Sequence, residues 1–171
     1  MEETIVNKVA NSALVTIDLA DYRPQGQRTF IDLSQWLEEG ILLREKPFRA
    51  ALNAHDWKQY TDHFVAIAYQ ANTVIPAWAA LLVASHLQPY AAVMVLGSLE
   101  ALEQKLFSDR IAQLDVHPFV GKPLIIKGCS DASLPQDAYI QLVGRLQSVA
   151  KSLFYGEACS SVPLWKAKKQ G

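Results

Sequence analysis

The sequence contains only two cysteines in 171 residues, too few for the disulfide framework of a small secreted protein. Its longest apolar stretch, residues 74–87, is interrupted by Pro76 and His86, and it is shorter than the about 20 residues that cross a bilayer. The first residues are acidic and lack a basic segment followed by an apolar one, so we expect no signal peptide. Together these absences predict a cytoplasmic protein without a membrane partner, whose thiols stay reduced.

The chain also lacks an excess of either charge, with 16 Lys and Arg against 17 Asp and Glu. A net charge of −1 gives no global attraction toward nucleic acid or an anionic membrane, so we predict no nucleic-acid partner. The glycine-rich dinucleotide and P-loop patterns and the G-x-S-x-G nucleophile motif are all absent. No motif therefore names a reaction, and whether the chain is an enzyme stays open.

What is present is the composition of a globular protein, with 50% apolar and 19% charged residues. Apolar runs at residues 64–68, 92–96, 122–126 and 152–155 alternate with helical patterns. Such an order, β-α-β-α-β-α-β, predicts an α/β fold with a mainly parallel sheet flanked by helices. We expect one α/β domain over residues 1–171 with this core at 61–165, and the four strands to end along one edge of the sheet.

Residues 1–60 are predicted to be an N-terminal strand and helix extension of this core. Residues 14–19 and 29–33 resemble half-buried strands, and the turn at 23–27 between them predicts a hairpin. Helical signals follow at Ser34, which would cap a helix that ends at Gly40. A second helix is predicted over residues 46–54, and residues 2–11 predict a short one.

The two cysteines occur in similar settings, each just after an apolar run that is expected to form a strand. Cys129 follows Gly128, and Cys159 comes three residues after Gly156. If the two strands are parallel neighbours, both thiols emerge at the same edge of one sheet, where open α/β proteins bind their ligands. The constellation predicts a shared metal or redox site, although their spacing matches no C-x-x-C or zinc-finger pattern.

A metal site with two thiolates needs further ligands, and His55 and Asp56 are the best source in the sequence. They end a predicted helix and enter a loop, which leaves both free to face a site. Two cysteines and one histidine would leave an open fourth position on zinc, and Asp56 would close it or support the other ligands. The same ligands suit iron or an iron–sulfur cluster.

Simpler interpretations stand beside this one. His55 at the end of a helix is also typical of a C-terminal cap, and free cysteines often only fill space in a core. His86 lies on the apolar face of a helix and is expected to be a core histidine. In one alternative the cysteines are structural parts of a binding module. In the other they carry out sulfur relay or redox chemistry without a metal, and Cys129, near a helix start, is the reactive group.

Four runs of residues resemble an uncharacterised bacterial family of unknown function, DUF2480, over nearly the whole chain. Ala158 departs from the family pattern, where proline is expected before the second cysteine, and this departure leaves both thiols in place. The runs are His55-Asp56-Trp57, Pro76-Ala77-Trp78, Lys127-Gly128-Cys129-Ser130 and Gly156 to Pro163.

This resemblance implies no assigned activity. It does imply an association with iron–sulfur cluster assembly, and hence with assembly proteins as partners. The leading hypothesis is therefore a metal-site protein that binds zinc or iron through Cys129, Cys159, His55 and Asp56, with an accessory role in that assembly.

Overall fold

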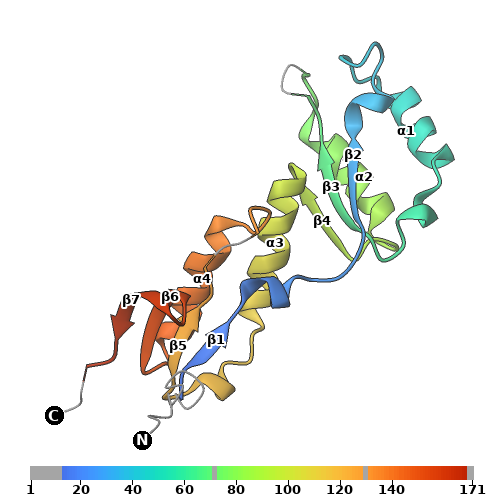
Figure 1. Cartoon of the computed structure of the whole chain (residues 1–171). Helices are drawn as coiled ribbons and strands as arrows, with labels where there is room; N and C mark the ends of the chain where they lie inside the picture. The colour runs from blue at the N-terminus through green and yellow to red at the C-terminus, as the bar shows by residue number, and fades with distance from the viewer. Residues whose placement is uncertain (1–12, 71–72, 129–130, 169–171) are drawn as a thin grey trace, which may run out of the picture. The chain divides into compact units, whose positions relative to one another are not determined.

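The computed structural model describes residues 13–70, 73–128 and 131–168. The chain divides into two compact units (Figure 1). Unit 1 comprises residues 1–24 and 107–171, and unit 2 comprises residues 25–106. The α/β class predicted from the sequence is confirmed, because each unit combines helices with mainly parallel strands.

Unit 2 contains a parallel sheet of three strands in the order β2-β3-β4, which lie side by side in Figure 1. The predicted helix at 46–54 and the predicted strand at 64–68 are both present, as α1 and β3. The elements are β2 (Arg28–Asp32), β3 (Phe64–Ala68), β4 (Val93–Leu96), α1 (Glu45–Ala54), α2 (Ala77–Leu87) and the 3-10 turns η2 (Leu33–Trp36) and η3 (Trp57–Tyr60).

The central strand of unit 2 is buried on both of its faces. Val65 and Ile67 of β3 belong to the core that α1 and α2 also line. Ala66, which points to the opposite face, packs with Leu102 and Leu106 of α3 (Leu99–Ala112). Helices on both faces are what a parallel sheet requires, since its strands expose no face to water.

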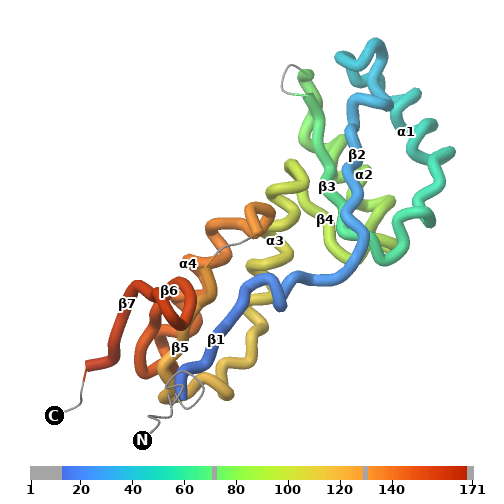
Figure 2. The backbone as a smooth tube through the Cα atoms, in the orientation of Figure 1, coloured from blue at the N-terminus to red at the C-terminus, as the bar shows by residue number. Residues whose placement is uncertain are grey.

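Unit 1 contains a four-stranded sheet in the order β1-β5-β6-β7, in which only β7 runs antiparallel to its neighbour. In Figure 2 the blue strand β1 lies beside the orange strand β5, although they are far apart in the sequence. The elements are β1 (Val15–Ile17), β5 (Pro123–Ile126), β6 (Ser152–Glu157), β7 (Ser160–Lys166), α4 (Gln136–Gln147) and the 3-10 turns η1 (Leu19–Tyr22) and η4 (His117–Phe119).

The core of unit 1 lies between this sheet and α4. Ala138, Leu142 and Leu146 follow one another at the four-residue spacing that places side chains on one helix face. They pack in one cluster with alternate residues of β5, Leu124 and Ile126. The second half of α3 completes the same cluster, so this helix begins in unit 2 and ends in unit 1.

The hairpin predicted for residues 14–33 is wrong. β1 pairs with β5 and β2 pairs with β3, in both cases parallel, so the two strands belong to different sheets. The sequence between them is no tight turn, because residues 19–22 form η1, which Asp18 caps by accepting a hydrogen bond from the Ala20 amide. The helix expected after Ser34 is also only the short turn η2, and Asp32 caps it instead of Ser34.

Their alternation with helices predicted that the four core strands form one sheet. This prediction is wrong. β3 and β4 belong to the sheet of unit 2, and β5 and β6 belong to that of unit 1. The physical reason is that β1 and β2 supply each half with an additional parallel partner, so each half completes a sheet of its own. The ends of all four strands therefore do not lie along one edge of one sheet.

Candidate functional site

Charged side chains lie at the edge of the unit 1 sheet where β1, β5 and β6 end. Asp18 follows β1, Lys127 follows β5 and Glu157 is the last residue of β6. Because these strands are parallel neighbours, their carboxyl ends meet. We call this region, built from the residues that follow the three strands, the carboxyl edge. Ligands bind at such edges in open α/β folds.

Two glycines bring the backbones of β5 and β6 together at the carboxyl edge. The Gly128 amide donates a hydrogen bond of 3.3 Å to the Gly156 carbonyl, and a Cβ placed on Gly128 would lie 3.6 Å from the Gly156 Cα. Gly156 has φ of +121°, which L side chains rarely adopt. The strands that lead to the two cysteines are thus parallel neighbours. This is the condition under which the sequence predicts both thiols at one edge of one sheet.

Of the two cysteines, only Cys159 lies within the described residues. Cys159 lies in the turn between β6 and β7, where its thiol side chain is exposed to solvent. Cys129 follows the glycine pair directly in the sequence, but it lies outside the described residues. Their sharing of a site stays a prediction.

An ion pair links the ends of β1 and β5. The Lys127 Nζ donates to the Asp18 Oδ2 at 2.8 Å, and the other Asp18 oxygen accepts from the Ala20 amide at 2.9 Å. The hydrogen bond from Lys127, followed by that from Ala20, holds the pKa of Asp18 below its usual value. The same bond to Asp18 raises the pKa of Lys127. Both groups are therefore charged at neutral pH.

A second polar cluster joins Arg23, Asp131 and Ser133. Arg23 Nη2 forms an ion pair with Asp131 Oδ2 at 3.2 Å and also donates to the Ser133 hydroxyl. Hydrogen bonds from the Ser133 hydroxyl and from its amide, at 2.9 Å, lower the pKa of Asp131. The residue that follows Cys129 and Ser130 in the chain is thus an ionised carboxylate.

The Asp18–Lys127 pair yields a prediction for the pH dependence of stability. Because the pKa of Asp18 is lower in the folded state, its contribution is present at neutral pH and is lost as the pH falls through that folded-state pKa. Asp18→Asn keeps the oxygen that caps η1 but removes the charge. We expect it to cost below about 1 kcal/mol at pH 7, since the pair is partly exposed to solvent.

Urea unfolding of both proteins between pH 7 and pH 2 measures this difference. It should shrink as the pH falls below the ordinary Asp value of about 3.9. Lys46→Gln, which removes a charge from the exposed surface of α1, is the control and should show no such trend. A constant cost of Asp18→Asn at every pH would contradict the assignment.

His55 and Asp56, predicted as metal ligands, belong to unit 2. His55 Nε2 lies 2.9 Å from the Tyr60 hydroxyl, and the two rings stack with centroids 5.7 Å apart. Asp56 caps η3 by accepting a hydrogen bond of 3.1 Å from the Lys58 amide. Each residue thus has a structural role of its own in unit 2, and their role as ligands stays a prediction.

The surroundings of His55 are strongly aromatic. Trp36 meets its ring edge-on at 5.3 Å, and Trp57 does so at 4.7 Å. Trp57 is buried, donates from Nε1 to the Leu52 carbonyl at 2.7 Å, and stacks on His86 at 5.2 Å. Burial, followed by the charge of Asp56, raises the pKa of Tyr60. The end of α1 is thus held in an aromatic cluster that includes His55.

Within residues 13–70, 73–128 and 131–168, no three His, Cys, Asp or Glu side chains gather closely enough to hold a metal ion. In the same part of the chain, no helix is both long and apolar enough to cross a membrane. The sequence did not predict a role for Asp18, Lys127, Arg23 or Asp131. Lys127 carries a usable signal, because it is a charged residue that directly follows an apolar strand pattern, whereas Asp18 lies within the strand pattern at residues 14–19.

Comparison with known proteins places the chain in a family without an assigned role. The family model described as "Protein of unknown function (DUF2480)" matches residues 3–167. The match confirms the resemblance inferred from four runs of residues, two of which contain the cysteines. No curated protein and no solved structure matches the chain, so an activity has to be argued from its own residues.

Proposed function

We propose, for a chain that belongs to the DUF2480 family of proteins of unknown function, that Cys129 and Cys159 together bind a zinc or iron ion. The observation that carries the proposal is the pairing of the two strands that lead to them. Ile126 lies opposite Tyr155 in the parallel register, and the next contact is the hydrogen bond from Gly128 to Gly156. Cys129 and Cys159 follow this glycine pair by one and three residues.

The chemistry of the ligands supports this choice of metals. Thiolates select zinc, iron and copper(I) over magnesium or calcium, which prefer oxygen. Two thiolates leave two positions of a tetrahedral zinc site to other ligands or to water. His55 and Asp56 stay predictions for these positions.

Metal analysis of tag-free protein purified without oxygen tests the proposal. We expect about one zinc or iron per chain, as in other single-metal sites, with both thiols protected until a chelator is added. Cys129→Ser and Cys159→Ser should each abolish stoichiometric binding, because one thiolate alone holds the metal weakly. Ser130→Ala and Ser160→Ala alter the neighbouring residues but keep both thiols, so they should retain the metal.

Two results would contradict the proposal. One is full metal content in both cysteine variants, and the other is a metal-free wild-type protein whose two thiols react freely. His55→Gln and Asp56→Asn, measured in the same way, decide separately whether these residues are ligands. Their failure to lower the metal content would remove them from the site without affecting the cysteines.

The exposure of Cys159 favours a second candidate, thiol chemistry without a metal. An accessible thiol reacts readily when its pKa lies below the ordinary value of about 8.5. The rate of alkylation measured against pH in each single-cysteine variant would reveal such a thiol. Two ordinary thiols in a metal-free protein would instead favour a binding module with structural cysteines.

The family resemblance adds a cellular role to the leading proposal, as an accessory protein of iron–sulfur cluster assembly. That role requires iron, or a cluster, at the cysteines in protein purified from iron-replete cells. Zinc as the resident metal under those conditions would count against it. The same samples thus test the metal site and its cellular role separately.

A further inference from the structure

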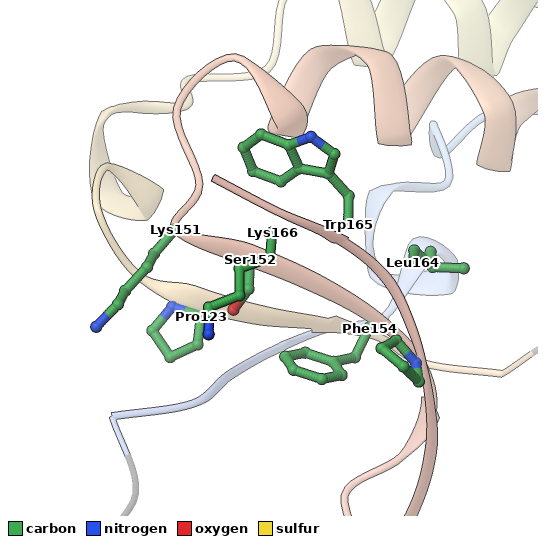
Figure 3. Close-up of a pocket in the computed structure, with 8 residues that line it drawn as sticks. Pro123, Lys151, Ser152, Phe154, Leu164, Trp165 and Lys166 are labelled. Carbon is green, nitrogen blue, oxygen red and sulfur yellow. The ribbon is translucent and has the colours of Figure 1, made fainter. Parts of the chain in front are cut away.

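A groove of about 570 Å³ lies in unit 1 at the edge of the sheet where β5 and β6 begin, opposite to the carboxyl edge (Figure 3). Its size falls within the range of small-molecule sites, about 300–1,000 Å³. We call it the amino-edge groove. It is lined by Pro123, Lys151, Ser152, Phe154, Pro163 and Lys166, together with Leu164 and Trp165.

A β-bulge in the hairpin of β6 and β7 places a charged and an apolar residue on the same face of the sheet. Lys166 lies opposite Ser152 and Pro163 lies opposite Phe154, with a register shift between Leu153 and Phe154. Directly opposed residues of an antiparallel pair share a face. Lys166 and Pro163 are three positions apart, so they would lie on opposite faces of a regular strand. The extra residue of the bulge places them on the same face.

The opposite face of the same hairpin is turned toward the core. Leu153 is fully buried, and its partner Trp165 packs against the core cluster of unit 1. Figure 3 shows the Trp165 ring on one side of the strands and the Phe154 ring on the other. The groove therefore lies on the side of the hairpin that carries Phe154, where the Phe154 ring and two proline rings line it.

Among the described residues, the charges that line the amino-edge groove have a single sign. Lys151 and Lys166 line it, and no Asp or Glu of residues 13–70, 73–128 or 131–168 does. Neither lysine takes part in an ion pair with any residue of the described chain, whereas Lys127 and Arg23 of the same unit do. In a chain of net charge −1, two ammonium groups that pair with no described carboxylate and lie beside an apolar surface are complementary to an anion with an apolar body.

We infer that the amino-edge groove binds a small organic anion with a flat apolar body, such as an aryl carboxylate or sulfonate. The ammonium groups of Lys151 and Lys166 pair with the anionic group. The Phe154 ring and the prolines Pro123 and Pro163 cover the flat body, as apolar linings do in small-molecule sites. Lys151, which directly precedes β6, is separated from Gly156 by five positions of extended chain, or ~17 Å, so the groove is distinct from the proposed metal site.

Two fluorescent naphthalene probes test the inference on the full chain. 8-Anilinonaphthalene-1-sulfonate carries the anionic group, and N-phenyl-1-naphthylamine has the same rings without it. We expect one saturable site for the sulfonate. The double variant Lys151→Gln/Lys166→Gln should raise its Kd about tenfold but change that of the neutral probe by less than about twofold. Phe154→Leu, which replaces the flat ring, should weaken both probes.

The matched control is Lys46→Gln/Lys58→Gln, which removes two exposed charges from unit 2 and should leave both affinities unchanged. Far-UV circular dichroism confirms that each variant is folded. Three outcomes would overturn the inference: no saturable site for the sulfonate, an unchanged Kd in the groove double variant, or an equal loss in the control. The metal content of these variants should equal that of the wild type, so the outcome is independent of the cysteines.

Discussion

Gly156→Ala is expected to destabilise the protein by about 2–4 kcal/mol. The φ of Gly156, +121°, lies in a region that costs any L side chain conformational energy. In addition, the new Cβ would lie 2.7 Å from the Ser160 carbonyl oxygen and 3.3 Å from the Ser161 Cα. Both of these are backbone atoms of β7, so they cannot move aside as a flexible side chain would.

Urea unfolding of wild-type protein and variant measures this loss. Gly144→Ala is the matched control, because Gly144 is an exposed residue in the middle of α4 with nothing within 4 Å of a new Cβ. Alanine there should stabilise the protein by about 1 kcal/mol. Equal stability of Gly156→Ala and the wild type would show that the hairpin does not need the glycine conformation.

The second large effect is expected for Phe107→Ala, at about 3–5 kcal/mol. Phe107 is fully buried and belongs to the core of unit 1 with Leu124, Leu142 and Leu153. The substitution removes an aromatic ring from the place where α3 meets the sheet. Because the surroundings collapse only partly, a cavity adds to the lost transfer free energy.

Unfolding curves again give the overall loss, and amide hydrogen exchange in β5 and β6 localises it. Ile140→Ala is the control, since Ile140 is 72% exposed on α4 of the same unit, and it should change stability by less than about 0.5 kcal/mol. A cost of Phe107→Ala no larger than that of the control would place Phe107 outside the stabilising core.

The sequence predicts individual elements of this fold better than their partners. The apolar runs that form β3, β5 and β6 are bounded by polar residues, glycine or proline, and α1 carries a clear helical pattern. Pairing across the sheet is a long-range property, which periodicity does not contain. For that reason the predicted hairpin and the single sheet were wrong, although every strand in them exists. β7 was missed because Pro163 within a short run argues against a strand.

In the candidate site, too, local features could be predicted from the sequence and long-range contacts could not. The condition that the strands before both cysteines are parallel neighbours is met, and the sequence shows glycine and cysteine at the corresponding ends of these strands. The ion pair of Asp18 with Lys127 joins residues 109 positions apart, a separation that no local pattern spans. The hydrogen bond of His55 with Tyr60 depends on the packing of an aromatic cluster, so the sequence left both a cap and a ligand open.

The division of unit 1 into two stretches has a consequence for the growing chain on the ribosome. Unit 2 is complete once residue 106 has been made, whereas β1 has no partner until β5 emerges, about 110 residues after it. At about 5–20 residues per second, β1 waits roughly 5–20 s. Among the strands of the described residues, β1 is thus synthesised first but is among the last to pair, and all residues of unit 2 are made while β1 still lacks its partner.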